Sequence, residues 1–264
     1  IQARPVFRAS AGLTFDSWQA GYEAARQVVQ AKLWPANLRL LDPTEAGSAA
    51  GLKGDEALLI IGFESAEVPQ DWPIRQAVRL AREAGGRIED EAIRISDGSD
   101  EEVGRQGAVG AWRNSFVRAP YQRNLTAGMG VVGDTFETSI TWDRWPSFDA
   151  NVRAAMTGAL QRVCGGGTLS CRFTHVYTDG PAPYYSFSGM GRQGAEIEMW
   201  TELKKAASDA VIANGGTITH HHAVGRDHMP WYRQQRPELF HSALKAAKSA
   251  LDPKGILNPG ILVD

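Results

Sequence analysis

The sequence has few cysteines, no long apolar run and no block of basic residues. Its two cysteines, Cys164 and Cys171, are too few for a disulfide scaffold, so we expect reduced thiols in a cytoplasmic protein. A bridge between them across a tight hairpin is the alternative. The longest strongly apolar run, residues 57–63, is too short to cross a bilayer. With a formal net charge of −2 and no run of Lys or Arg, we expect no nucleic-acid partner.

Phosphate-binding signatures are also missing. There is no Walker loop, and no G-x-G-x-x-G follows a predicted strand. The glycine clusters at 128–133 and 189–194 stand in the wrong order relative to the predicted strands and helices. What is present is an ordinary globular composition, 43% hydrophobic and 22% charged over 264 residues. Such a chain can bury a sizeable core.

Helical and extended patterns are mixed along the chain. Apolar residues at spacings of three or four predict a first helix at 14–33, capped by Thr14. The same spacing predicts further helices at 70–86, 99–116, 148–164, 195–213 and 236–250. Alternating or buried apolar segments predict strands at 37–42, 56–64 and 128–142, and a hairpin at 168–189. This pattern indicates an α+β fold, with an antiparallel sheet covered by helices.

Four of the six histidines fall within residues 218–228, "ITHHHAVGRDH". We expect 217–222 to be extended, which would put His220 and His222 on one face and His221 on the other. Further metal ligands would have to come from residues at no recognisable metal spacing, namely His175, Asp227 or His228. Hydrogen bonding within a packed turn is the structural alternative. Because histidine titrates near neutral pH, the cluster favours proton handling, and we predict no metal.

The segment 213–263, "ANGGTITHHHAVGRDHMPWYRQQRPELFHSALKAAKSALDPKGILNPGILV", resembles the C-terminal end of FAD-linked oxidases of the vanillyl-alcohol oxidase superfamily. The uninterrupted triple histidine is most similar to that of the alkyldihydroxyacetonephosphate synthases. Four shorter stretches agree with this in order along the chain: "PANLRLLD", "APYQRN", "DTFETSITWDR" and "PYYSF". The resemblance implies FAD as cofactor. It also implies that 1–264 is a single substrate-binding cap domain with a C-terminal tail that packs on an FAD-binding domain lying upstream of Ile1.

The same resemblance implies roles for individual residues. Tyr184 would remove a proton from the substrate carbon, with Tyr185 as its rival, and His220, His221 and His222 would support proton handling. A tyrosine that only packs across strands is the structural alternative for Tyr184.

The resemblance also implies binding residues. Arg123 would bind the substrate phosphate, because a guanidinium offers a planar fork of donors, although a surface ion pair is the alternative. Arg39 would lie near the active site, with a solvated strand residue as the alternative. Asn258 in the tail would contact the flavin ring.

The activity implied is the exchange of the acyl chain of acyl-dihydroxyacetone phosphate for a fatty alcohol, a step of ether lipid synthesis. The pair Arg226-Asp227 departs from the synthase pattern, which leaves an FAD-linked oxidoreductase of a 2-hydroxy acid or alcohol as the alternative. A third hypothesis is a non-catalytic binding domain. We expect this chain by itself to be colourless and inactive. Peripheral membrane contact and a homodimer are further expectations that the resemblance leaves open.

Overall fold

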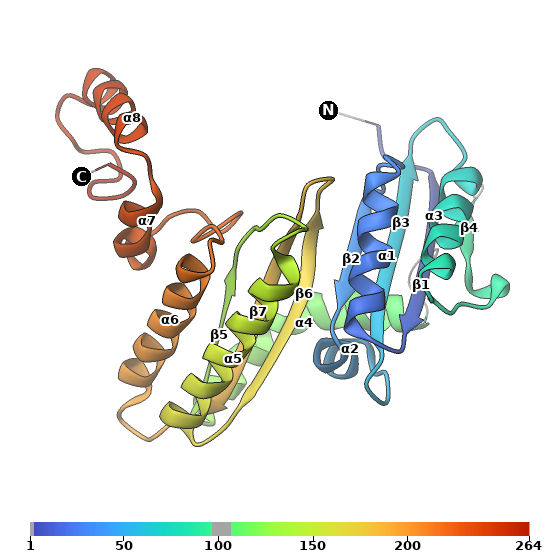
Figure 1. Cartoon of the computed structure of the whole chain (residues 1–264), viewed down its shortest axis with the longest axis horizontal. Coiled ribbons are helices and arrows are strands. Elements are labelled where there is room, and N and C mark those ends of the chain that lie inside the picture. The colour runs from blue at the N-terminus through green and yellow to red at the C-terminus, as the bar shows by residue number, and fades with distance from the viewer. Residues whose placement is uncertain (1–2, 97–106, 264) are drawn as a thin grey trace.

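The computed structural model describes residues 3–96 and 107–263. Its strands, in chain order, are β1 (Phe7–Phe15), β2 (Asn37–Leu41), β3 (Ala57–Ser65), β4 (Arg94–Ser96), β5 (Val131–Glu137), β6 (Thr168–Val176) and β7 (Pro181–Met190). They form one seven-stranded sheet in the order β4-β1-β3-β2-β6-β7-β5 (Figure 1). Each pair of neighbouring strands is antiparallel. The α+β class with an antiparallel sheet covered by helices is therefore confirmed.

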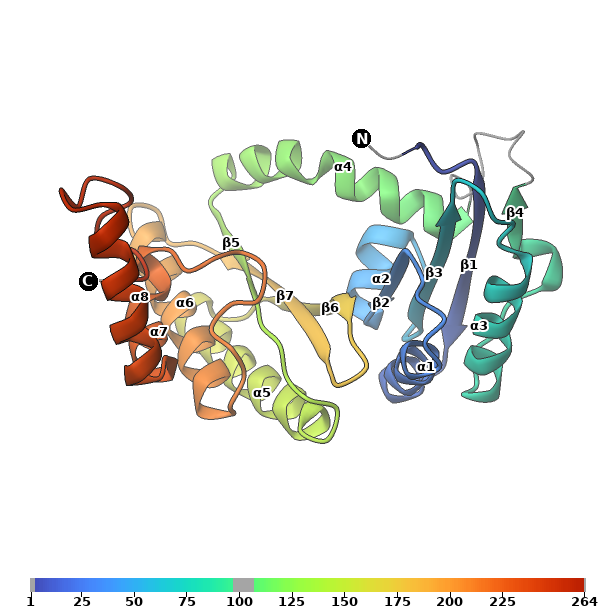
Figure 2. The same cartoon turned by 90° about the horizontal axis from the view of Figure 1, so that it is seen from above.

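The helices cover both faces of this sheet. In chain order they are α1 (Trp18–Gln30), α2 (Pro43–Ala50), α3 (Asp71–Glu83), the 3-10 turn η1 (Asp90–Ala92), α4 (Gly107–Gly128), α5 (Trp145–Cys164), α6 (Glu196–Ala213), the 3-10 turn η2 (Arg226–His228), α7 (Met229–Gln235) and α8 (Glu238–Leu251). Helices α1, α3, α5 and α6 enclose the main core against one face, and α2 and α4 lie on the other (Figure 2). Helices α7 and α8 stand beyond α6, away from the sheet (Figure 1).

Strand β3 shows how the two faces are filled. Leu59 and Ile61 belong to the main core, whereas Leu58 and Ile60 pack under α2 and α4 against Trp112. Alternate side chains of a strand point to opposite faces, so a strand covered on both sides reads as a continuous apolar run. The run "ALLIIGF" is therefore a central strand of the sheet.

A buried polar junction ties the two halves of the sheet together. The carboxylate of Asp149 on α5 accepts hydrogen bonds from Trp18 Nε1 (3.0 Å), Tyr185 Oη (2.7 Å) and Arg153 Nε (2.9 Å). Arg153 also donates to Asp42 (3.0 Å), the residue that caps α2. Because these residues lie on α1, β7, α5 and the start of α2, one network fixes how the helices meet the sheet.

The predicted helix at 14–33 begins too early. Thr14 and Phe15 belong to β1, which pairs with β3 along its whole length. Helix α1 starts later, after Ser17, whose Oγ accepts a hydrogen bond from Ala20 N (3.1 Å). Pairing with a distant strand has overridden the local helical spacing. The sequence also did not predict the first strand or the short helices α2 and α7.

The predicted helix at 99–116 lies partly outside the described residues. Its described part belongs to α4, which begins at Gly107 and continues to Gly128. Cys164 and Cys171 are free thiols at the end of α5 and within β6. Across residues 3–96 and 107–263, no helix has the length and apolar character needed to cross a membrane.

The Asp149 junction predicts that replacing Asp149 costs much more stability than replacing an exposed aspartate. Asp149→Ala leaves the indole of Trp18 and the phenol of Tyr185 without their acceptor, and we expect a loss of roughly 3 kcal/mol in the free energy of unfolding. Asp90→Ala breaks only an exposed ion pair with Arg82 and should cost less than about 1 kcal/mol. Urea denaturation of both variants measures the difference. Equal losses would contradict the structural role of Asp149.

Candidate active site

Three neighbouring strands place polar side chains on the face of the sheet opposite the main core. In the strand register, Tyr184 of β7 stands opposite both Glu137 of β5 and Arg172 of β6. Directly opposed residues point to the same face, so the three form a row across the sheet. This row is the floor of the candidate site.

The triple histidine lies directly over this row. Oε1 of Glu137 accepts hydrogen bonds from the backbone N–H groups of His220 (2.8 Å), His221 (3.0 Å) and His222 (3.0 Å), and from the hydroxyl of Thr219. The predicted extended segment, with alternating histidines, is therefore wrong. Successive N–H groups can converge on one anion only if the backbone curves around it.

Glu137 was not predicted as a site residue. The sequence offered one signal, a glutamate within a strand whose other residues are suited to burial. In the structure the Glu137 side chain is only 1% exposed. Burial pushes the pKa of Glu137 upward, but the hydrogen bonds from Thr219 and the three histidine N–H groups outweigh it and lower the pKa overall. The site is thus built around a buried negative charge.

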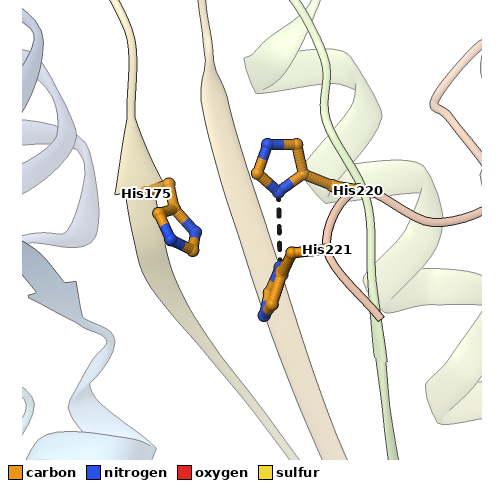
Figure 3. A group of neighbouring side chains, drawn as sticks. All are labelled: His175, His220 and His221. Atoms are coloured by element: carbon orange, nitrogen blue, oxygen red, sulfur yellow. Dashed lines mark hydrogen bonds between the residues drawn. The ribbon is translucent and has the colours of Figure 1, made fainter. Parts of the chain in front are cut away.

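The histidine rings gather with one further histidine from β6. Nδ1 of His220 lies 3.3 Å from Nδ1 of His221, and Nε2 of His220 lies 2.9 Å from the hydroxyl of Tyr177. His175 faces the pair, with its ring centroid 4.9 Å from that of His221 and 5.3 Å from that of His220 (Figure 3). Partial desolvation, followed by the charges of His221 and His220, lowers the pKa of His175 and favours its neutral form.

The imidazole nitrogens of three histidines are a chemically suitable ligand set for zinc. One nitrogen from each of His175, His220 and His221 lies within 4.8 Å of the others. Of the extra ligands considered from the sequence, His175 joins the pair, whereas Asp227 and His228 line a separate cavity of about 160 Å³ beside His222. The prediction that the site works without a metal stays a prediction.

The two adjacent tyrosines point to opposite faces of the sheet. Tyr184 lies with the histidines: its ring centroid is 5.2 Å from that of His222 and 6.1 Å from that of His221. Its hydroxyl donates to Thr135 Oγ1 (3.0 Å). Tyr185 is fully buried in the main core, where burial raises its pKa well above the ordinary value. The geometry therefore brings Tyr184, and not Tyr185, to the candidate site.

Arg172 stacks on Tyr184. Its guanidinium carbon lies 4.0 Å from the centre of the tyrosine ring, which is a cation-π contact. Glu45 of α2 holds the guanidinium in place through a bond of 2.7 Å. Arg172 is a second residue that the sequence did not single out, since only the strand register puts it beside Tyr184.

Arg39 borders the site from β2. Its guanidinium carbon lies 4.6 Å from the centre of the Trp112 ring, and its Nε donates to Asn37 (3.2 Å). It lines two cavities, of about 440 and 340 Å³, and the second also reaches His175 and Tyr177. Burial, and then the charge of Arg172, lowers the pKa of Arg39. Its side chain therefore faces the histidine side of the sheet.

Arg123 and Asn258 lie farther out. Arg123 is exposed on α4, with its guanidinium 3.7 Å from Asp134, which lines the cavity beside His222. This is the ion pair that the sequence left as the alternative. Asn258 lies in the tail after α8, which folds beside α7 and α8 and away from the sheet (Figure 2). The structure does not bring Asn258 to the histidines, and its role stays a prediction.

The site is thus a polar face of an antiparallel sheet that carries one tyrosine and a cluster of histidines. Residues 4–262 match the family described as FAD linked oxidases, C-terminal domain. The chain belongs to this family.

Curated relatives narrow the comparison. The chain is 29% identical to the alkyldihydroxyacetonephosphate synthase of Caenorhabditis elegans over 98% of its length, and 23% identical to that of Trypanosoma brucei brucei over 100%. It spans 46% and 45% of those proteins, which is less than half of each. Over a shorter stretch of 69 residues, the chain is 42% identical to the glycolate oxidase subunit GlcD of Bacillus subtilis.

Solved structures share the fold. An alkyldihydroxyacetonephosphate synthase structure superposes with a TM-score of 0.71 at 17% identity, over 98% of this chain and 45% of that one. A 4-ethylphenol oxidase from Gulosibacter chungangensis gives a TM-score of 0.63 at 12% identity, over 100% of this chain and 55% of that one. At these identities the likeness concerns the fold alone.

The buried charge of Glu137 predicts a pH dependence of stability. Its folded pKa lies below the ordinary value of 4.5, so its stabilisation is complete above that value and is lost as the pH falls through the folded pKa. Glu137→Gln removes this titration. Between about pH 6 and about pH 3.5, we expect the free energy of unfolding to fall more steeply in the unmodified protein than in the variant. Denaturant titrations at each pH measure this free energy. If it falls equally with pH in both proteins, the ionisation of Glu137 does not contribute to stability.

Proposed function

We propose that this chain is the substrate-binding and catalytic half of an FAD-dependent enzyme that exchanges the acyl chain of acyl-dihydroxyacetone phosphate for a fatty alcohol. The observation that carries the proposal is the placement of Tyr184 beside His221 and His222, on the face of the sheet opposite the main core. The synthase relatives, aligned over 98–100% of this chain, support the choice of substrates. In this proposal FAD is held mainly by a domain outside residues 1–264.

The residues present fit a flavin-linked site. His221 and His222 are exposed and Tyr184 is half-buried, so their rings are accessible on a face not filled by the main core. When bound, the flavin supplies the electron-accepting ring that activates the substrate carbon. In this proposal Tyr184 gives its phenolic proton to a neighbouring histidine as it takes a proton from that carbon, because a phenol near pKa ~10 is a weak base without such a partner. The proton stays within one cluster of side chains.

The arginines are proposed to bind the phosphate end of the substrate. Arg123 is close enough to Asp134 for an ion pair at 3.7 Å, yet its side chain is 69% exposed, so its donors remain accessible. Arg39 supplies a second positive charge on the histidine side of the sheet. The guanidinium of either residue offers a planar fork of donors that suits a phosphate group.

An FAD-linked oxidoreductase of a 2-hydroxy acid or alcohol is the second candidate. The 42% identity to the glycolate oxidase subunit over 69 residues favours it. So does the His175, His220 and His221 cluster, which has the donor atoms to bind a metal that polarises a hydroxyl group. Two assays on the intact protein separate the candidates. Incorporation of labelled fatty alcohol without lasting flavin reduction supports the synthase, and anaerobic bleaching of the flavin by a 2-hydroxy acid supports the oxidoreductase.

The two tyrosines provide a matched test of the base. Tyr184→Phe should reduce turnover of the intact protein by about 100-fold or more, because the acid–base group is removed, and should leave the unfolding midpoint nearly unchanged. Tyr185→Phe removes a core hydrogen bond to Asp149, so it should cost about 1 kcal/mol of stability and leave turnover largely intact. Steady-state kinetics and thermal denaturation distinguish them. Full turnover in Tyr184→Phe would remove this residue from the mechanism.

A second pair of variants tests the phosphate site. Arg123→Ala should raise the KM for acyl-dihydroxyacetone phosphate by about tenfold or more, since a charged hydrogen bond contributes roughly 1.5–3 kcal/mol. Arg118→Ala, on the same helix and also exposed, is the control and should leave KM within about twofold. If both variants shift KM equally, the effect belongs to the general charge of α4 and not to a specific phosphate contact.

A further inference from the structure

A cavity of about 440 Å³ lies over β1, β3 and β2, on the same face of the sheet as the candidate site. The strand register shows how it forms. Gly62 of β3 stands opposite Ser10 of β1 and Asn37 of β2, so the three residues form one row across the sheet. Glycine has no side chain, and the centre of this row is therefore open. We call the cavity over this row the Gly62 hollow.

Arginines from three elements line the Gly62 hollow: Arg8 of β1, Arg39 of β2 and Arg113 of α4, which lies over the same face (Figure 2). Among the described residues of the lining, Glu64 is the only acid. Because a guanidinium stays protonated in proteins, the lining carries three positive charges and one negative charge. This balance suits a ligand with two negative charges.

Arg8 has a donor that the protein itself does not use. Its Nε is buried and has no hydrogen-bond acceptor among residues 3–96 and 107–263. Glu64 lies 3.7 Å from that nitrogen, close enough for an ion pair but too far for a hydrogen bond. The Arg8 side chain is 24% exposed, so a ligand can reach it from solvent. A buried N–H without an acceptor is costly, and a ligand oxygen in the hollow would relieve that cost.

A second cavity lined by arginines shows the contrast. It has about 420 Å³ and lies beside α3. There Arg79 donates to Glu83 at 2.6 Å, and Arg82 donates to Asp90 at 2.6 Å. These guanidinium groups are neutralised by close carboxylates of the protein itself. The Gly62 hollow therefore differs in how its arginines are paired, and not merely in how many it has.

We propose that the Gly62 hollow is a second binding site of this chain, for a small molecule that carries a phosphate monoester. Such a phosphate is a dianion near neutral pH. Arg8 and Arg39 offer it planar forks of charged donors from two sides of the row. Ser10 and Asn37 add a hydroxyl and an amide N–H₂ on the floor. The missing side chain of Gly62 leaves the space in which the phosphate lies.

This site is separate from the proposed acyl exchange and does not depend on it. The row of Tyr184 meets β3 at Leu58, four residues before Gly62, and three strand spacings separate β7 from β3. At ~3.3 Å per residue and ~4.8 Å per strand, Gly62 lies roughly 20 Å from Tyr184. The phosphate of acyl-dihydroxyacetone phosphate is only a few bonds from the carbon that Tyr184 would deprotonate. The hollow therefore takes a different molecule, although Arg39 also lines the cavity beside His175.

Arginine side-chain NMR of the 264-residue chain tests the site, with inorganic phosphate as the probe. The ¹H–¹⁵N signal of Arg8 Nε, assigned by its loss in Arg8→Gln, should shift in a saturable way with a Kd below about 1 mM. The signal of Arg79 should not move, because its charge is already paired. An Arg8 signal that does not saturate, or an equal shift of Arg79, would overturn the proposal.

Three variants separate the hollow from the general charge of the surface, with phosphate binding measured by calorimetry. Arg8→Gln should weaken binding by about tenfold or more, because a charged donor is lost. Gly62→Ala keeps every charge, and its methyl group would meet no atom closer than Asn37 Cβ at 3.4 Å, so the strand accommodates it. It fills the floor of the hollow and should weaken binding by about threefold or more. Arg79→Gln is the control and should stay within about twofold.

Two outcomes of these titrations would count against the site. If Gly62→Ala binds phosphate as tightly as the unmodified chain, the anion is held by surface charge and not in the hollow. The same titration on the intact, flavin-bound protein should give a similar Kd. Loss of binding there would assign the hollow to the flavin or to its domain, and would overturn a site for a separate molecule. Neither result bears on the acyl-exchange assay, because the phosphate titrations need no turnover.

Discussion

Three consecutive backbone N–H groups and one hydroxyl converge on a single oxygen of Glu137, and the geometry of the site depends on this contact. The contact holds the loop between α6 and η2 against β5, and it bends the loop so that adjacent histidines do not alternate as they would in a strand. His221 then reaches both His220 and His175, which a straight segment would not allow. The buried carboxylate of Glu137 on the edge strand β5 thereby holds three consecutive histidines in a bent loop, where their rings cluster with His175.

The two faces of the sheet have different roles: one face packs against the main core, and the other carries the residues of the candidate site. Side chains that face α1, α3, α5 and α6 build the main core, and Asp149 joins the helices to it. The side chains of Glu137, Arg172 and Tyr184 lie in one row on the opposite face of the sheet. Tyr184 and Tyr185 illustrate the division, because neighbours in one strand serve opposite faces. Changes in the proposed chemistry therefore need not disturb the core that supports it.

His221 and His222 are exposed and His220 is half-buried. Residues 4–262 match the family of FAD linked oxidases, C-terminal domain, and the chain spans less than half of the synthases that it matches. In the proposed enzyme the histidine face is one wall of the active site, and the flavin would complete it.

Much of the fold could be predicted from the sequence, because helical spacing, the buried run of β3 and the turn residues between β6 and β7 are local signals. The clustering of histidines was visible in the same way. The sequence could not show the pairing of β1 with β3, the choice between the two tyrosines or the approach of His175. The contact between Glu137 and the His220 N–H joins residues 83 positions apart. Such contacts exist only after the strands have paired in register, so the composition of the site was determined by the sequence and its geometry was decided by the tertiary structure.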